Sequence, residues 1–218
     1  MRIVAVNGSL IAGGNTSELM NGALEVYEKE PDVEVDRFDL CSMEVGHCRQ
    51  CNWCLRKQEP GRYCSQDDSM SLVYPALLEC SGLLIATPVH FGRLSGATAD
   101  FLDRLRVFVH GNITASAMRN KVGGAMSVAW FRNAGSEMAL LNINTAFQVL
   151  SMLIAPPDLG VLGAAAFSSI EGKGERRGID RLLVREDQIG MAVARSLAAR
   201  VLEVSRMVEA GSNAAEKP

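Results

Sequence analysis

The sequence has no long apolar run and no excess of basic charge. Its first apolar segment, residues 2–6, ends at Asn7-Gly8-Ser9, so it is too short for a signal-peptide core or a membrane span. The formal net charge is −3, which leaves no basic surface of the kind that binds a phosphate backbone. We therefore expect a cytoplasmic protein that binds neither a membrane nor nucleic acid.

Two nucleotide-binding fingerprints are missing as well. Neither G-x-G-x-x-G nor G-x-x-x-x-G-K-[ST] occurs, which argues against a nicotinamide Rossmann site and against a nucleoside triphosphatase. What remains is a chain of 218 residues, 48% of them hydrophobic, which is enough to bury one sizeable core. We expect one domain over residues 1–210 and a disordered tail over residues 211–218, which are small and polar.

Strand-like and helix-like segments alternate along this domain, which predicts an α/β fold with a parallel sheet covered on both faces by helices. Continuous apolar runs predict five strands, over Arg2–Val6, Val33–Phe38, Gly82–Ala86, Val122–Ala129 and Gly160–Phe167. Helical spacing predicts helices around residues 19–27, 94–108, 140–153 and 189–208, and a weaker one over residues 67–80, which Pro75 interrupts. Two segments fall outside this pattern, the cysteine-rich insertion 41–66 and a charged, exposed loop over residues 171–181.

The loop after the first strand combines glycines with short polar side chains. It reads Gly8-Ser9 and then Gly13-Gly14-Asn15-Thr16-Ser17-Glu18, with Asn15 and Glu18 spaced as a capping box for the helix that follows. Unpaired N–H groups at a helix N-terminus and short hydroxyl side chains can bind a phosphate without a lysine. The loop therefore suits a flavin monophosphate, and the alternative is an ordinary strand-to-helix turn with a good cap.

The third strand is followed by Thr87-Pro88-Val89-His90-Phe91-Gly92 and then by Leu94-Ser95-Gly96 and Phe101-Leu102-Asp103-Arg104. Together with the first loop, this stretch resembles the NADPH-dependent FMN reductase and iron–sulfur flavoprotein group of flavodoxin-like proteins. The resemblance covers residues 1–137 and implies a three-layer flavodoxin-like sandwich with strand order 2-1-3-4-5. His90 stands where that group usually has a tyrosine.

The resemblance also implies which residues bind flavin mononucleotide (FMN). The first loop would bind the phosphate, and the second would lie along the ring through its backbone. The third loop, after the fourth strand, is similar to the R-N-G-G-Q-E stretch of the group, and its Arg132 would stabilise the reduced ring near N1 and O2. For Trp130, and for Phe131 beside it, packing at the strand end is the alternative to ring contact. The expected FMN-binding residues are Ser9, Gly14, Asn15, Thr16, Ser17, Thr87, Pro88, Val89, His90, Phe91, Gly92, Trp130, Arg132, Asn133 and Gly135.

The six cysteines do not form an obvious disulfide framework, because four of them cluster. The spacing Cys48-x2-Cys51-x2-Cys54 lets one loop bind three corners of a [4Fe–4S] cluster, with Cys64 as the fourth ligand. Iron–sulfur flavoproteins carry a compact motif of this type at the same place, although the nine residues between Cys54 and Cys64 are more than is usual there. Zinc bound by the cysteines, or no metal at all, are the alternatives.

These features predict an FMN-dependent oxidoreductase or electron-transfer flavoprotein that takes electrons from ferredoxin or NAD(P)H and passes them to a small-molecule or protein acceptor. FMN can accept a hydride as an electron pair, while an iron–sulfur cluster passes single electrons, so the two cofactors would complement each other. The resemblance implies a homodimer or homotetramer. The alternatives are an NAD(P)H-dependent FMN or quinone reductase without a cluster, and a non-enzymatic redox-responsive module with cysteine-bound zinc.

Overall fold

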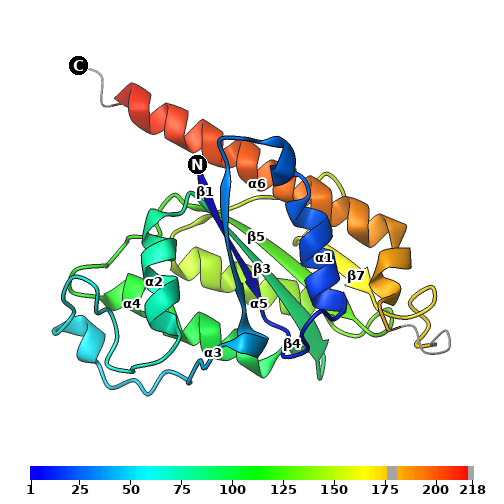
Figure 1. Ribbon diagram of the computed structural model, residues 1–218, viewed down its shortest axis with the longest axis horizontal. Coiled ribbons are helices and arrows are strands. Elements are labelled where there is room, and N and C mark those ends of the chain that lie inside the picture. Colours follow the sequence, from blue (N-terminus) through cyan, green and yellow to red (C-terminus); the bar gives the residue numbers. More distant parts are fainter. Residues whose placement is uncertain (176–180, 216–218) are drawn as a thin grey trace.

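The apolar segments form a largely parallel sheet, which Figure 1 shows in a computed structural model that describes residues 1–175 and 181–215. Its strands are β1 (Arg2–Asn7), β2 (Glu34–Asp39), β3 (Gly82–His90), β4 (Arg93–Leu94), β5 (Val122–Ala129), β6 (Leu153–Ile154) and β7 (Ala164–Phe167). The order is β2-β1-β3-β5-β6, with β7 also paired to β5 and β4 paired to β3. This confirms the predicted flavodoxin-like α/β fold.

The predicted number of five strands is wrong, because the described residues form seven. The fifth position of the sheet is shared: β6 pairs with the start of β5, and β7 pairs with its end, from Met126 to Ala129. Pro156 and Pro157 lie between β6 and β7, and because proline has no N–H to donate, the chain leaves the ladder there. The remaining strand, β4, is a two-residue return that runs antiparallel to the end of β3.

Helices cover both faces of the sheet, because successive side chains of a strand point to opposite faces and β1 and β5 are buried almost throughout. Ile3 and Ala5 of β1 pack with the helices α1 (Asn15–Leu24) and α6 (Gln188–Ala215). Val4 and Val6 point the other way, into a core with α2 (Met70–Glu79), α3 (Gly96–Arg104), α4 (Val107–His110) and α5 (Ser136–Val149). The expected three layers are present.

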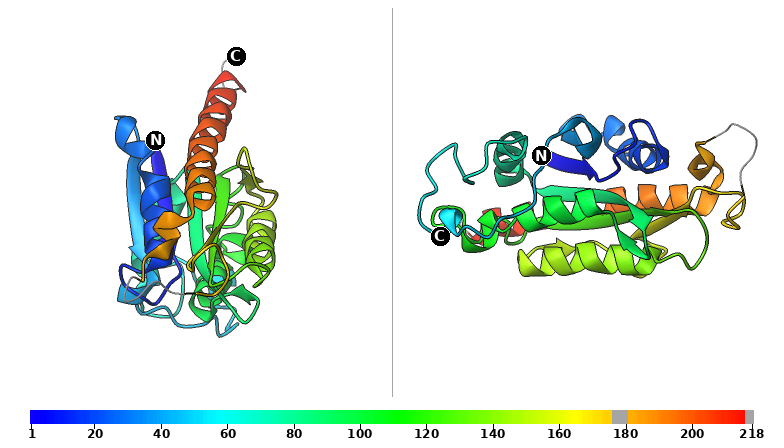
Figure 2. Two further views of the ribbon diagram at one scale, coloured as in Figure 1. Left: turned by 90° about the vertical axis from the view of Figure 1, so that its right-hand side faces the viewer. Right: turned by 90° about the horizontal axis from the view of Figure 1, so that it is seen from below.

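Three helical predictions need correction. Helix α6 continues to Ala215 and projects past the sheet (Figure 2), so the expected tail is helical at residues 211–215. Residues 216–218 lie outside the described part. The helix expected over residues 94–108 is divided into α3 and α4. Helix α2, in contrast, runs uninterrupted through Pro75, which lies on its exposed side.

The two irregular segments are found where they were expected. Residues 41–66 follow β2 and contain only short helical turns, Leu40–Ser42 and Trp53–Leu55. The charged loop is described at residues 171–175 and 181, and the rest of it lies outside the described residues. Within the described ranges, no helix combines the length and the apolar character that crossing a bilayer requires.

Candidate functional site

A cleft of about 660 Å³ opens where the carboxyl ends of the parallel strands meet. Its walls come from the loop after β1, the end of β3, the end of β5, the residue after β7 and the segment before α6. Ligands of doubly wound α/β proteins bind at this edge, and pockets of a few hundred Å³ hold cofactor-sized molecules. The cleft is lined by Ser9, Ile11, Ala12, Gly13, Gly14, Asn15, Thr16, Pro88, Val89, His90, Val128, Trp130, Ser168, Arg181, Leu182 and Leu183.

The loop after β1 is held in place by its own polar side chains. Asn7 Oδ1 accepts a hydrogen bond from the Ser9 backbone N–H at 3.2 Å, and Ser9 Oγ accepts one from the Ile11 N–H at 3.1 Å. The loop delivers the chain to α1, whose N-cap is Gly14 and which therefore has no side-chain cap. The first N–H groups of a helix have no acceptor within the helix, so the start of α1 offers free donors to the cleft.

The capping box predicted for Asn15 and Glu18 is wrong. Asn15 is the first residue of α1, and its side chain binds the segment before α6: Nδ2 donates to the Arg181 carbonyl at 2.6 Å, and Oδ1 accepts from the Val184 N–H at 3.0 Å. Glu18 pairs with Arg185 at 2.7 Å. Both side chains therefore join α1 to a segment about 165 residues further along, which no local pattern could indicate.

The end of β3 brings Pro88, Val89 and His90 to the cleft, while the other predicted members of this segment are not part of its lining. Phe91 and Gly92 form a two-residue hairpin turn with positive φ angles of 49° and 76°, and the Phe91 side chain is fully exposed. The Thr87 hydroxyl is buried beneath the turn, where it accepts hydrogen bonds from the Ser95 N–H at 3.1 Å and the Thr98 hydroxyl at 2.9 Å. These residues shape the turn rather than line the cleft.

The loop after β5 contributes one of its four predicted residues to the cleft lining, Trp130. The Arg132 guanidinium instead donates from Nε to the Glu171 carbonyl at 3.0 Å and lies over the Phe167 ring at 5.1 Å. Asn133 has a φ of 57°, and Gly135 has a φ of 104°. A Cβ on Gly135 would lie 2.3 Å from the Gly92 carbonyl oxygen, so these two turns are packed backbone to backbone.

The remaining predicted residue of the first loop, Ser17, faces away from the cleft lining. Its hydroxyl accepts a hydrogen bond from Arg37 Nη2 at 2.6 Å. The sequence interpretation in turn missed Arg181, Leu182 and Leu183, which bring a positive charge and apolar side chains to the cleft from before α6. The basic composition around Arg181 predicts only an exposed loop, because nothing local relates it to the first loop.

The four clustered cysteines line a second, small cavity on the other side of the sheet. Cys48, Cys51, Cys54 and Cys64 share it with residues of their own loop and with Arg104, Arg106 and Val107. Among the described residues, no three His, Cys, Asp or Glu side chains converge closely enough to hold a single metal ion. In a cubane each thiolate binds a different iron, so its ligands surround the cluster without meeting at one point. Cys41 and Cys80 lie outside this cavity.

The environments of the cysteines differ. A hydrogen bond with Ser65 Oγ, at 3.3 Å, and a backbone bond with Trp53 lower the pKa of Cys51. Burial raises the pKa of Cys54, against the opposing effect of the Arg106 guanidinium beside it. A lowered pKa favours the thiolate, which is the form that binds metals.

A buried ion pair fixes the loop that carries these cysteines. Arg104, of which only 2% is exposed, donates from Nη2 to Asp68 Oδ1 at 3.0 Å and from Nη1 to the Gly46 carbonyl at 2.9 Å. Burial would raise the pKa of Asp68, but the bonds and charge of Arg104 outweigh it and lower that pKa. The sequence interpretation assigned no role to this arginine, because its partners lie 36 and 58 residues away.

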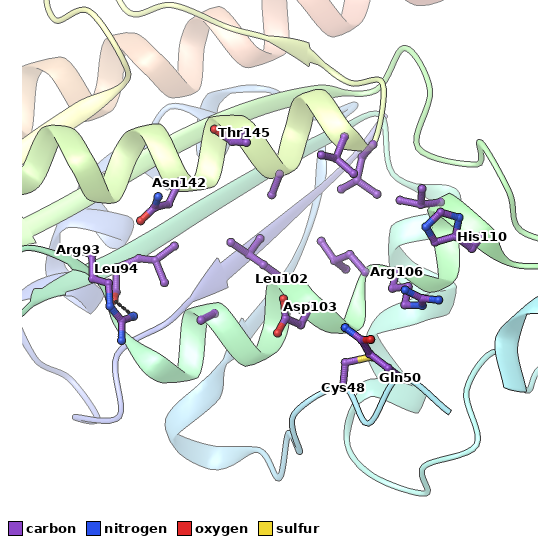
Figure 3. A pocket seen from close by; sticks show the side chains of 16 residues that line it. Cys48, Gln50, Arg93, Leu94, Leu102, Asp103, Arg106, His110, Asn142 and Thr145 are labelled. Carbon is purple, nitrogen blue, oxygen red and sulfur yellow. Dashed lines mark hydrogen bonds between the residues drawn. The ribbon is translucent and has the colours of Figure 1, made fainter. Parts of the chain in front are cut away.

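A wider groove of about 540 Å³ begins beside this cavity and runs between α3 and α5. Figure 3 shows Cys48 and Gln50 at one end of it, opposite Arg106, and Arg93 with Asn142 toward the other end. Cys48 and Arg106 line both the groove and the cysteine cavity. The cysteine site is therefore open to the surface on this side.

The sheet, the uncapped α1 and the cleft at the strand ends define a flavodoxin-like flavoprotein. The family model of NADPH-dependent FMN reductases matches residues 1–166, and the chain belongs to this family. Membership confirms the resemblance drawn from the first two loops and makes the chain an FMN-dependent oxidoreductase.

Relatives agree with this assignment along the whole chain. Two iron-sulfur flavoproteins from Methanocaldococcus jannaschii are 30% and 32% identical, covering 96% and 94% of this chain and 100% and 96% of their own length. The iron-sulfur flavoprotein of Methanosarcina thermophila is 27% identical over 96% of this chain and 97% of its own. Among solved structures, RosB covers 99% of this chain and 86% of its own with a TM-score of 0.72 at 18% identity, which shows the shared fold.

Proposed function

We propose that this chain holds FMN in the cleft and a [4Fe–4S] cluster in the cysteine cavity, and passes electrons between them. The observation that carries the flavin part is that an uncapped helix N-terminus and the end of β3, residues 88–90, line the same cleft. When bound there, FMN would supply the change between two-electron and one-electron chemistry.

The cleft residues divide by what they can offer to FMN. Asn15 and Thr16 present backbone N–H groups at the start of α1, and Arg181 adds a positive charge, which together suit a phosphate. Val89, Val128 and Trp130 provide flat or apolar surface of the kind that a ring system packs against. Their role is to bind and orient the flavin and to exclude water from one side of it.

The cluster part of the proposal rests on the donor set of the small cavity. Four thiols from one loop line it, at the spacing of a three-cysteine motif with a fourth ligand further on. Three arginines on the same cavity, Arg49, Arg104 and Arg106, supply the positive charge that thiolates require when they are buried. Five relatives that match over nearly their whole length are named iron-sulfur flavoprotein, which supports the same reading.

The partners belong to the proposal too. Ferredoxin or NAD(P)H would donate electrons, and a small molecule or protein would accept them. A homodimer or homotetramer would bring the cysteine cavity of one subunit near the flavin cleft of another. Six free cysteines suit the reducing cytoplasm, where we place the protein.

Anaerobic purification followed by flavin, iron and acid-labile sulfide analysis tests this proposal. We expect FMN absorbance overlaid by broad cluster absorbance, with both bleached on titration with NADPH or with reduced ferredoxin. Cys64→Ser should lower iron and sulfide content while FMN stays bound. The matched control is Cys41→Ser, which changes a cysteine outside the cavity and should keep the full iron content.

The same preparation separates the alternatives. A yellow protein without iron, even when isolated anaerobically, would show a cluster-free FMN or quinone reductase. A colourless protein that does not take up added FMN would contradict both oxidoreductase readings and favour a redox-responsive module with bound zinc.

A further inference from the structure

Two arginines that line the cysteine cavity each carry a buried N–H donor with no hydrogen-bond acceptor in the described part of the chain. These donors are the Nε groups of Arg104 and Arg106, and both arginines line the cavity with the four cysteines. Leaving such a donor unpaired costs about 1–3 kcal/mol, and more when the group is charged. Two such groups in one small cavity indicate acceptors that are not part of the polypeptide.

The other nitrogens of these guanidinium groups hold the surrounding loop. Arg104 uses Nη1 and Nη2 for Gly46 and Asp68, and Arg106 Nη2 donates to Asn52 Oδ1 at 2.8 Å. Asn52 lies in the turn between Cys51 and Cys54 and has a φ of 57°. Because a guanidinium is planar and rigid, fixing its terminal nitrogens also fixes the direction of Nε–H.

Both arginines also share the cavity with thiols, because Cys54 and Cys64 line it together with Arg104 and Arg106. Figure 3 shows Arg106 facing the cysteine loop across the end of the groove.

We propose that Arg104 and Arg106 donate these Nε–H bonds to the sulfur atoms of the bound cluster and so raise its reduction potential. This inference rests on the proposed [4Fe–4S] cluster. Four thiolates carry more negative charge than the oxidised core carries positive charge, and reduction adds one electron without breaking a bond. Positive charge and hydrogen bonds at the sulfurs favour the more negative, reduced form. The arginines would act through charge and hydrogen bonds alone, and no covalent bond to them forms or breaks.

Anaerobic spectroelectrochemistry tests this, with dithionite as reductant, absorbance following the flavin, and electron paramagnetic resonance following the cluster. Arg106→Gln removes the charge and the Nε donor at a half-buried position, while Arg106→Lys and Arg104→Lys keep the charge but lose the donor. Arg119→Gln, at an exposed position away from the cavity, is the matched control.

We expect the cluster midpoint potential to fall in Arg106→Gln and to fall less in the two lysine variants, with an unchanged flavin potential and unchanged iron content. If the three arginine variants keep their iron and have the same cluster potential as the wild type and Arg119→Gln, the proposed role of the arginines is overturned, but the proposed cluster is not. Absence of iron from the wild type would overturn the cluster itself, and this inference with it.

Discussion

The phosphate site at the start of α1 can be tested by placing a negative charge in it. Thr16 is the second residue of α1, is 3% exposed and lines the cleft. A carboxylate in Thr16→Asp, at about 4 Å from a phosphate oxygen, would repel it by about 1 kcal/mol in water and about 4 kcal/mol at an effective dielectric constant of 20. The Kd for FMN should therefore rise between roughly fivefold and several hundredfold.

Riboflavin, which lacks the phosphate, provides the comparison. We expect its Kd to change by less than about threefold, and the melting temperature to be kept or raised, because an acidic residue in the first turn is favoured by about 0.3–1 kcal/mol. Flavin fluorescence titration measures both affinities.

Two controls accompany this variant. Thr16→Asn places a side chain of the same shape as aspartate at this position without the charge. Ser71→Asp adds the charge at the second residue of α2, away from the cleft. Equal losses of FMN and riboflavin affinity, or no loss of either, would refute the assignment of the phosphate to α1.

Three further predictions concern the ion pair, the ring contact and the packed turns. Asp68→Asn should lower the free energy of unfolding by about 3 kcal/mol in urea melts at pH 7, because it leaves a buried arginine unpaired. The pKa of Asp68 is lowered from its ordinary 3.8, so the stability that the ionised carboxylate gives is present above that pH and is lost as the pH falls below it. Asp68→Asn should therefore lose less stability than the wild type on acidification. Equal losses of stability in the two proteins at low pH would contradict the pairing. Trp130→Leu should weaken FMN and riboflavin alike, roughly tenfold, in the same fluorescence titration, whereas Trp53→Leu should weaken neither; unchanged binding by Trp130→Leu would leave packing as the role of Trp130. Gly135→Ala should lower the melting temperature by several degrees more than Gly61→Ala in thermal scans, because both have positive φ but only Gly135 has a backbone oxygen within 2.3 Å of the added Cβ; equal shifts would show that the turns are not packed as described.

Local patterns were sufficient for the α/β architecture, for the first loop and for the cysteine motif. Strands buried on both faces need unbroken apolar runs, so β1, β3 and β5 could be read directly from the sequence, and parallel strands bring their carboxyl ends to one edge. Glycines and small polar residues before a helix predicted the loop of Ser9 and Gly14, because helix termini have the same unpaired donors in any protein. The spacing of Cys48, Cys51 and Cys54 likewise indicated that these thiols share one small volume.

Side-chain directions depend on partners far away in the sequence, and these only the tertiary structure decided. Asn15 is turned toward residues 181 and 184, Thr87 lies beneath its own turn, and Arg132 lies over Phe167. Each predicted residue type was chemically suitable, but a side chain binds whichever partner the fold brings within reach. Arg104, whose partners are 36 and 58 residues away, could be found only in the folded chain, because no repeating period along the sequence connects a helix end to a distant loop.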